Sequence, residues 1–251
     1  MNSLTVSLVV FACIFSGALL GMLLRATLPE HHLGSDSKDI VKLGMGFVGT
    51  MAALVLGRLV ASAKGSFDVQ STELTQMAAN IGLLDRALAQ YGPETKDARD
   101  MLRVVVARLI DQVWSKDRAG PAPLDPSSVS GWAFFEKIQG LSPKDDRQRL
   151  LQTQALNLAI GLGQTHWLMY EQGTTSVSVP LLVVLVLWLT LILGSFGLFA
   201  PANATVITSL CLSALSVSGA IFLILEMYSP YSGVIQVSNA PVRAALAHLG
   251  Q

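Results

Sequence analysis

Few residues in this chain have the types and spacing that catalysis or metal binding requires. The sequence contains no glycine-rich phosphate loop, no HExxH zinc motif, no CxxC pair and no nucleophile elbow. Its closest carboxylate pairs, Asp97 with Asp100 and Asp145 with Asp146, fit helix starts and solvated helix surfaces. We therefore expect a protein that is not an enzyme and that carries no cofactor.

Histidine and cysteine could in principle bind a metal. The loop from Pro29 to Asp39 contains the adjacent pair His31 and His32 among carboxylates. Adjacent histidines rarely point at one ion, so a solvated loop is favoured over a metal site. Cys13 and Cys211 each lie within an apolar run, which is typical of small buried hydrophobic residues and not of a disulfide or zinc site.

Two features inside apolar runs are better candidates for function. Arg58 and Glu226 are lone charges near the ends of their runs, so they could pair with each other or each reach the lipid headgroups. A face of small and hydroxyl-bearing residues could line a wet pathway, although packing against another helix is favoured. This face, the hydroxyl face, consists of Thr205, Ser209, Ser213 and Ser216, followed by Ala220.

The composition indicates which elements must position these residues. The chain has 251 residues, of which 51% are hydrophobic and 14% are charged, whereas soluble domains carry about 25% charged residues. Of the 34 charged residues, 25 lie between Lys64 and Glu171. This distribution predicts one part in contact with lipid and one part in water. The net charge of zero and the lack of a basic run exclude a nucleic-acid-binding surface.

Four apolar runs are long enough to cross a bilayer as helices: residues 4–24, 40–62, 177–199 and 204–227. The first could be a cleaved signal peptide, but no positive residue precedes it and no small-residue cleavage site follows, which favours a retained span. Small residues recur at intervals of four in the first two spans, which favours close helix packing. They are Gly17 and Gly21, then Gly49, Ala53 and Gly57.

The polar segment between the second and third spans has the pattern of a helical bundle. A stripe with steps of three and four residues predicts a helix that continues from the second span and ends before Gly92 and Pro93. Further helices are expected over 94–116, 132–139 and, starting from a Ser142 cap, 142–172. The residues 117–131 are rich in proline and should form a loop. The stripe is Leu74, Met77, Ile81, Leu84, Leu88 and Tyr91.

The expected fold is therefore all-α, with a helical bundle inserted between membrane helices two and three. The predicted boundaries are 1–66 for two spans, 67–175 for the bundle, 176–231 for two further spans and 232–251 for a tail. The tail should contain a short amphipathic helix that lies on the membrane surface or docks on the bundle. An even number of spans, with no export signal or disulfide, favours cytoplasmic placement of both termini and of residues 67–175.

Several segments resemble a known family. They include HHLGSDSKDIVKLGMGFVGTMAALVLGRLVASAKGSFD, STELTQMAANIGLLDRALAQYGPE, FGLFAPANATV and SGAIFLILEMYSPYSGVIQVS. Together they resemble the bestrophin-like domain family of bacterial membrane proteins. The resemblance implies kinship with bestrophins, which are pentameric anion channels gated through a membrane neck. The second span departs from the bestrophin neck because Phe47 is its single aromatic residue.

Two functions follow as alternatives. The first is a homo-oligomeric ion channel in the bacterial inner membrane, suggested by the resemblance, the small-residue faces and the hydroxyl face. The second is a membrane-anchored scaffold or sensor whose cytoplasmic bundle binds a protein partner. Against the channel, no span carries a charge at its middle.

Overall fold

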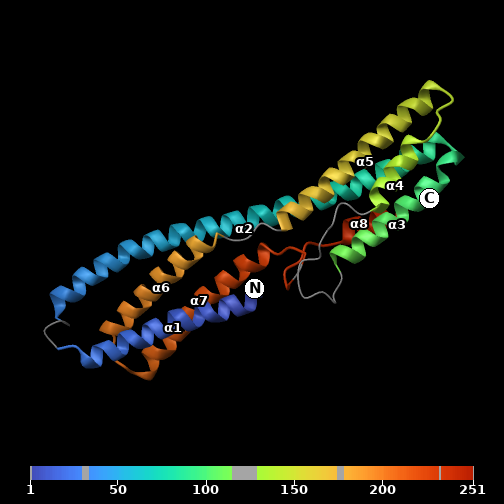
Figure 1. Ribbon diagram of the computed structural model, residues 1–251. Coiled ribbons are helices and arrows are strands. Elements are labelled where there is room, and N and C mark those ends of the chain that lie inside the picture. The colour runs from blue at the N-terminus through green and yellow to red at the C-terminus, as the bar shows by residue number, and fades with distance from the viewer. Residues whose placement is uncertain (1, 30–33, 115–128, 174–177, 232, 251) are drawn as a thin grey trace. The chain divides into compact units, whose positions relative to one another are not determined.

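The computed structural model describes residues 2–29, 34–114, 129–173, 178–231 and 233–250. Within these ranges every regular element is a helix, so the predicted all-α class is confirmed. Figure 1 shows the order of the helices along the chain. Four of them, α1, α2, α6 and α7, are long and apolar enough to span a membrane. The helices are α1 (Ser3–Thr27), α2 (Ser35–Tyr91), η2 (Pro93–Thr95), α3 (Lys96–Val113), α4 (Val129–Gln139), α5 (Asp146–Gly173), α6 (Val179–Phe199), α7 (Ala204–Met227) and α8 (Ala240–His248).

The chain divides into two compact units. The first, here called the membrane unit, comprises residues 1–65 and 176–228, and the second, the bundle, comprises residues 66–175 and 229–251. The helix α2 runs without interruption from Ser35 to Tyr91 and so contributes residues to both units. The C-terminal tail belongs to the bundle and does not form a separate part.

In the membrane unit, α1 packs against both α6 and α7. The core between them is apolar and consists of Val10, Ile14, Ala18, Leu193, Leu210, Ala214 and Ile221. A second cluster places Ala52, Leu59 and Ala63 of α2 with Leu185 and Ile224. Most of the remaining α2 span is exposed, including Leu43 and Phe47, which fits a helix that faces lipid or another subunit.

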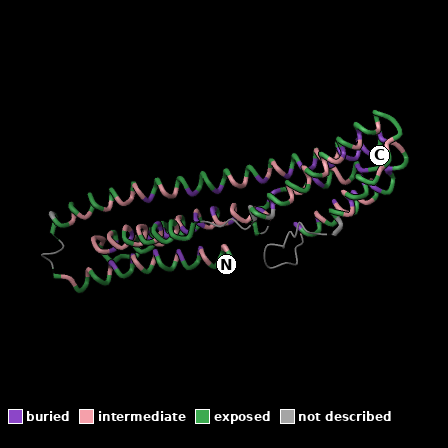
Figure 2. Tube along the Cα trace, turned by 45° about the horizontal axis from the view of Figure 1, so that its top comes forward, coloured by how far each residue is buried: buried purple, intermediate pink, exposed green. Residues whose placement is uncertain are grey.

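The predicted stripe on α2 forms the centre of the bundle. All six of its residues are at most 4% exposed, and they share one core with residues of α3, α4, α5 and α8. Figure 2 shows buried residues recurring along this part of the chain. The helix α5 contributes Leu151, Ala155 and Met169 to this core, with Leu158 and Leu162 packed beside them. Apolar residues of α2 and α5 therefore share one core.

The start of one helix differs from the sequence expectation. The helix α5 begins at Asp146 and not at Ser142, because the Asp145 carboxylate accepts a hydrogen bond from the Gln148 N–H at 2.7 Å. The Gln148 side chain in turn accepts a hydrogen bond from the Lys144 N–H at 2.7 Å, which fixes the chain just before the cap. After α2, Gly92 adopts φ 138° and ψ −179°, a positive-φ conformation that only glycine adopts readily.

The tail is held on the bundle. The helix α8 packs against α3, and Val242 and Leu249 are both at most 4% exposed in the bundle core. The indole N–H of Trp114 donates a hydrogen bond to the Val237 carbonyl at 3.1 Å, and its ring meets Tyr231 edge to face at 6.0 Å. Of the two predicted positions for the tail helix, the structure shows docking on the bundle.

Candidate functional site

The hydroxyl face of α7 is exposed in the membrane unit. Thr205, Ser209, Ser213 and Ser216 are all exposed, whereas Ala220 is half-buried. Together with neighbouring residues they line a shallow groove of about 620 Å³. The Ser213 and Ser216 hydroxyls donate to carbonyls of their own helix, Ser209 O at 2.9 Å and Leu212 O at 2.8 Å. The groove is lined by Ala204, Thr205, Thr208, Ser209, Leu212, Ser213 and Ser216.

The opposite face of α7 explains this orientation. Leu210, Ala214 and Ile221 are buried against α1, and the buried Ser218 hydroxyl donates a hydrogen bond to the Ser7 carbonyl at 2.7 Å. This apolar face and its hydrogen bond fix the rotation of α7 about its axis. Because packing within the chain uses that face, the hydroxyl face remains available to water, lipid or another subunit.

Two glycines of α1 allow α6 to approach closely. A Cβ on Gly21 would collide with the Gly194 carbonyl, and one on Gly17 would collide with the Thr190 side chain. On the α6 side, a Cβ on Gly197 would collide with the Ala18 carbonyl. Sequence reasoning missed Gly194 and Gly197, although their spacing of three residues in an apolar span was a usable signal.

The small-residue face of α2, formed by Gly49, Ala53 and Gly57, has few close neighbours. A Cβ added to Gly49 would lie 3.9 Å from the Ile192 side chain, at the limit of van der Waals contact. A Cβ added to Gly57 would have no atom within 4 Å. Ala53 and Gly57 are exposed. Within the chain, α2 packs through Ala52 and Leu59 instead, which lie on a different face. Among the described residues, Ala53 and Gly57 therefore do not make the predicted packing.

The two lone charges Arg58 and Glu226 differ in exposure. Arg58 is exposed, whereas Glu226 is 4% exposed at the end of α7. Their pairing therefore stays a prediction. The nearby Tyr228 hydroxyl donates a hydrogen bond to Ser62 of α2 at 2.9 Å, which ties the end of α7 to the second span.

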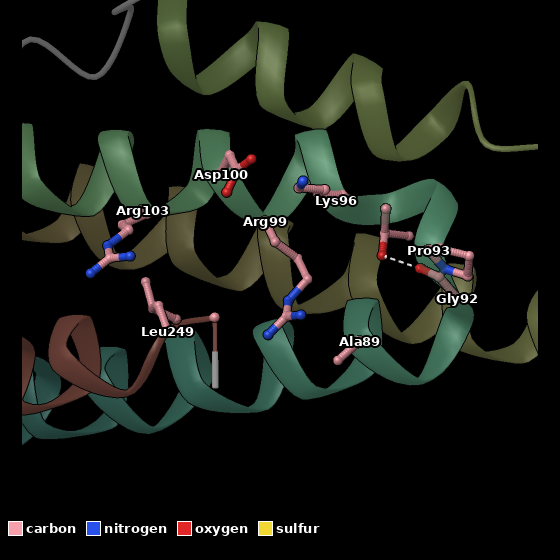
Figure 3. Close-up of a pocket in the computed structure, with 10 residues that line it drawn as sticks. Ala89, Gly92, Pro93, Lys96, Arg99, Asp100, Arg103 and Leu249 are labelled. Carbon is pink, nitrogen blue, oxygen red and sulfur yellow. Dashed lines mark hydrogen bonds between the residues drawn. The ribbon is translucent and has the colours of Figure 1, made fainter.

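A fully hydrogen-bonded ion pair lies in the bundle, and sequence reasoning missed it. Asp85 of α2 accepts hydrogen bonds from Arg99 of α3 at 2.7 and 2.8 Å and from the Gly250 N–H at 3.3 Å. Burial raises the pKa of Asp85, but the three hydrogen bonds and the Arg99 charge outweigh it, so the pKa lies below its usual value. A neighbouring pocket of about 440 Å³ contains Lys96, Asp100 and Arg103 (Figure 3).

Arg99 extends in Figure 3 from α3 towards α2, and Leu249 of the tail lies at the other end of the same pocket. The hydrogen bonds that Arg99 donates to Asp85 also hold the pKa of Arg99 above its usual value. The arrangement therefore acts as a clamp that joins α2, α3 and the tail. The Arg99 guanidinium already binds Asp85, so we assign this ion pair a structural role and not a ligand-binding one.

The described residues contain no cluster of three or more histidine, cysteine or carboxylate side chains able to hold a metal. His31 and His32, and most of the proline-rich loop, lie outside the described residues. Both cysteines are free thiols, and Cys13 is exposed on α1, contrary to the expectation that it is buried.

One family model, described as the Bestrophin-like domain, matches residues 12–242. The match spans both units, from α1 to the first turn of α8. No curated protein and no solved structure matches the chain.

Proposed function

Because this chain belongs to the bestrophin-like domain family, we propose that this membrane protein assembles from identical subunits into an ion channel. The proposed setting is the bacterial cytoplasmic membrane. The observation that carries the proposal is the hydroxyl face of α7, which lies on the exposed side of an apolar helix.

Lipid is a poor environment for a row of hydroxyl groups, even when each bonds to its own helix. The Ser213 and Ser216 hydroxyl groups donate their hydrogen bonds to carbonyls of their own helix. Each hydroxyl oxygen can still accept a hydrogen bond, and lipid chains offer no donor for it. A shared water-filled axis would satisfy these oxygens. It would also provide a polar, uncharged lining for ions that move through it.

The second span supports assembly from several subunits. The face formed by Gly49, Ala53 and Gly57 has room for close approach of another helix, and much of α2 around it is exposed. Small residues at such a face let two helix backbones pack tightly in lipid. A neighbouring copy of the chain is the proposed occupant of this face.

The proposed topology places both termini and the bundle in the cytoplasm. Labelling of single cysteines checks it, in a background with Cys13 and Cys211 replaced by alanine. An impermeant thiol reagent should reach Gln90→Cys from the cytoplasmic side and Ala202→Cys from the opposite side. Labelling of both positions from one side would contradict the topology of the four spans.

Flux from proteoliposomes tests the channel itself. Proteoliposomes that contain the purified protein should release a trapped ion. Ser216→Phe should reduce that flux strongly, because its ring would narrow the water-filled axis that the hydroxyl face lines. Leu215→Phe is the matched control, since Leu215 is 57% exposed on another side of the same helix. Absence of flux together with a monomeric particle would refute the channel, as would equal effects of the two substitutions.

A further inference from the structure

The bundle contains a recess that its core packing does not fill. It measures about 610 Å³ and lies among residues of α2, α3, α4 and α5. Small-molecule sites in proteins are commonly hollows of about 300–1,000 Å³ with apolar walls and a few polar groups. The recess therefore has the size of a site for a small organic ligand.

The inner wall of the recess is rigid and apolar. Met77 and Ile81 from the α2 stripe are 1% exposed, and Leu102, Val106 and Phe134 are at most 5% exposed. These side chains belong to the core of the bundle, so they hold their positions whether or not a ligand is present. A preformed wall of this kind favours the flat or extended body of an apolar group.

Two exposed tryptophans line the recess. Trp132 of α4 is 65% exposed and Trp167 of α5 is 54% exposed, and both line the recess. Trp132 is held by an edge-to-face contact with Phe135, with ring centroids 6.3 Å apart. Two exposed indoles beside an apolar hollow can close over an aromatic or acyl group and remove its surface from water.

The polar groups of the recess favour an anion. Arg108 lines it and is exposed, and it forms no ion pair with any described residue. The amides of Gln112 and Gln164 lie on the same lining, as does His166. None of the described residues that line the recess is an aspartate or glutamate. A guanidinium beside amide donors, with no carboxylate among these described residues, suits a carboxylate ligand.

We propose that this recess binds a small amphipathic carboxylate. Its apolar body lies against Trp132, Trp167 and the core wall, and its carboxylate accepts hydrogen bonds from Arg108. Gln112 and Gln164 offer further donors to the same group. The proposal concerns the bundle alone and stands whether or not the membrane unit conducts ions.

Fluorine NMR of the full chain labelled with fluorotryptophan tests the proposal, because the chain has four tryptophans. Naphthoate is the probe, and naphthylmethanol is its uncharged counterpart. Naphthoate should shift the Trp132 and Trp167 signals saturably and leave those of Trp114 and Trp188 unchanged. Parallel, unsaturable shifts of all four signals would show partition into lipid or detergent only and would overturn the proposal.

Arg108→Gln tests the assigned charge. It should weaken naphthoate binding at least tenfold, since hydrogen bonds to charged groups contribute that much or more. The wild-type protein and Arg108→Gln should bind naphthylmethanol with the same affinity. That affinity should be about as weak as the affinity of Arg108→Gln for naphthoate. Equal affinity of the wild-type protein for the two probes would overturn the carboxylate assignment.

Two neighbouring glycines of α5 provide a matched pair of variants. Neither Gly163 nor Gly161 has any atom within 4 Å of an added Cβ, but only Gly163 lines the recess. Gly163→Leu should reduce probe affinity at least tenfold, and Gly161→Leu should leave it unchanged. Both substitutions favour the helix, so folding is retained. Unchanged probe binding by Gly163→Leu would overturn the proposal. A smaller oligomer for Gly163→Leu alone would also overturn it, because the recess would then be a contact with another copy of the chain.

Discussion

The Asp85 carboxylate accepts two hydrogen bonds from the Arg99 guanidinium, at 2.7 and 2.8 Å, and so joins α2 to α3. The carboxylate is 7% exposed and the guanidinium 22%. The Gly250 N–H adds a third hydrogen bond at 3.3 Å. This one side chain therefore links two helices of the bundle to the end of the chain.

Asp85→Asn should destabilise the bundle. The variant loses the charge-assisted pair and leaves Arg99 partly buried without its partner, a loss of about 1–3 kcal/mol in the free energy of unfolding. Thermal unfolding of the purified protein measures it. Asp100→Asn is the control, because Asp100 is exposed on α3 and should change stability by less than about 0.5 kcal/mol. Equal losses in the two variants would contradict the assigned role of Asp85.

The same pair predicts a dependence of stability on pH. The pKa of Asp85 is lower in the folded protein than in the unfolded chain, where it is about 3.9. Its contribution is therefore complete above about pH 4 and is lost as the pH falls through the folded pKa. Wild-type protein should lose stability more steeply below about pH 4 than Asp85→Asn does. Parallel acid profiles, measured as melting temperature against pH, would show that Asp85 does not contribute.

Gly21→Ala should loosen the contact between α1 and α6. An added Cβ collides with the Gly194 carbonyl, which belongs to a rigid helix backbone and cannot move away alone. Overpacking of this kind destabilises by about 1–3 kcal/mol. Gly219→Ala in α7 is the matched control, since nothing lies within 4 Å of its added Cβ and alanine favours a helix. Melting temperatures in one detergent should fall for the first variant only.

Gln152→Met should loosen the end of α4. The Gln152 amide donates hydrogen bonds to three carbonyls, those of Ile138, Gln139 and Leu141, at 3.0, 3.2 and 2.9 Å. Methionine keeps the length of the side chain but leaves these carbonyls without their donor, with an expected loss of about 1–2 kcal/mol. Hydrogen exchange should become faster around residues 136–141. Gln154→Met is the control, because Gln154 is exposed on the same helix, and it should leave exchange unchanged.

Local patterns allowed much of the fold to be predicted. The stripe from Leu74 to Tyr91 is buried throughout, because helical periodicity directly reflects which side of a helix faces a core. Asn203, an asparagine directly before an apolar run, caps α7, and its side chain accepts a hydrogen bond from the Val206 N–H at 2.9 Å. The resemblance to the bestrophin-like family is confirmed by the match over residues 12–242.

Features that depend on distant partners could not be predicted in the same way. Asp85 and Arg99 lie 14 positions apart on separate helices, and their pairing depends on the turn at Gly92. The predicted start of α5 at Ser142 was wrong because Asp145 competes as the cap. The Asp145 carboxylate accepts from the Gln148 N–H, and the Gln148 side chain accepts from the Lys144 N–H. The hydroxyl face was expected to pack, but its exposure follows from the contact of the opposite face with α1, which the sequence of α7 alone does not specify.

The water accessibility of the hydroxyl face tests the central claim most directly. Single cysteines at Ser213 and Leu215, without Cys13 and Cys211, would be exposed in nanodiscs to a charged thiol reagent that does not enter lipid. Both positions are exposed on α7, so burial within the subunit protects neither. The channel account predicts rapid modification of Ser213→Cys and none of Leu215→Cys. Equal protection of the two cysteines would place the hydroxyl face in lipid or in a dry contact, and would contradict the account.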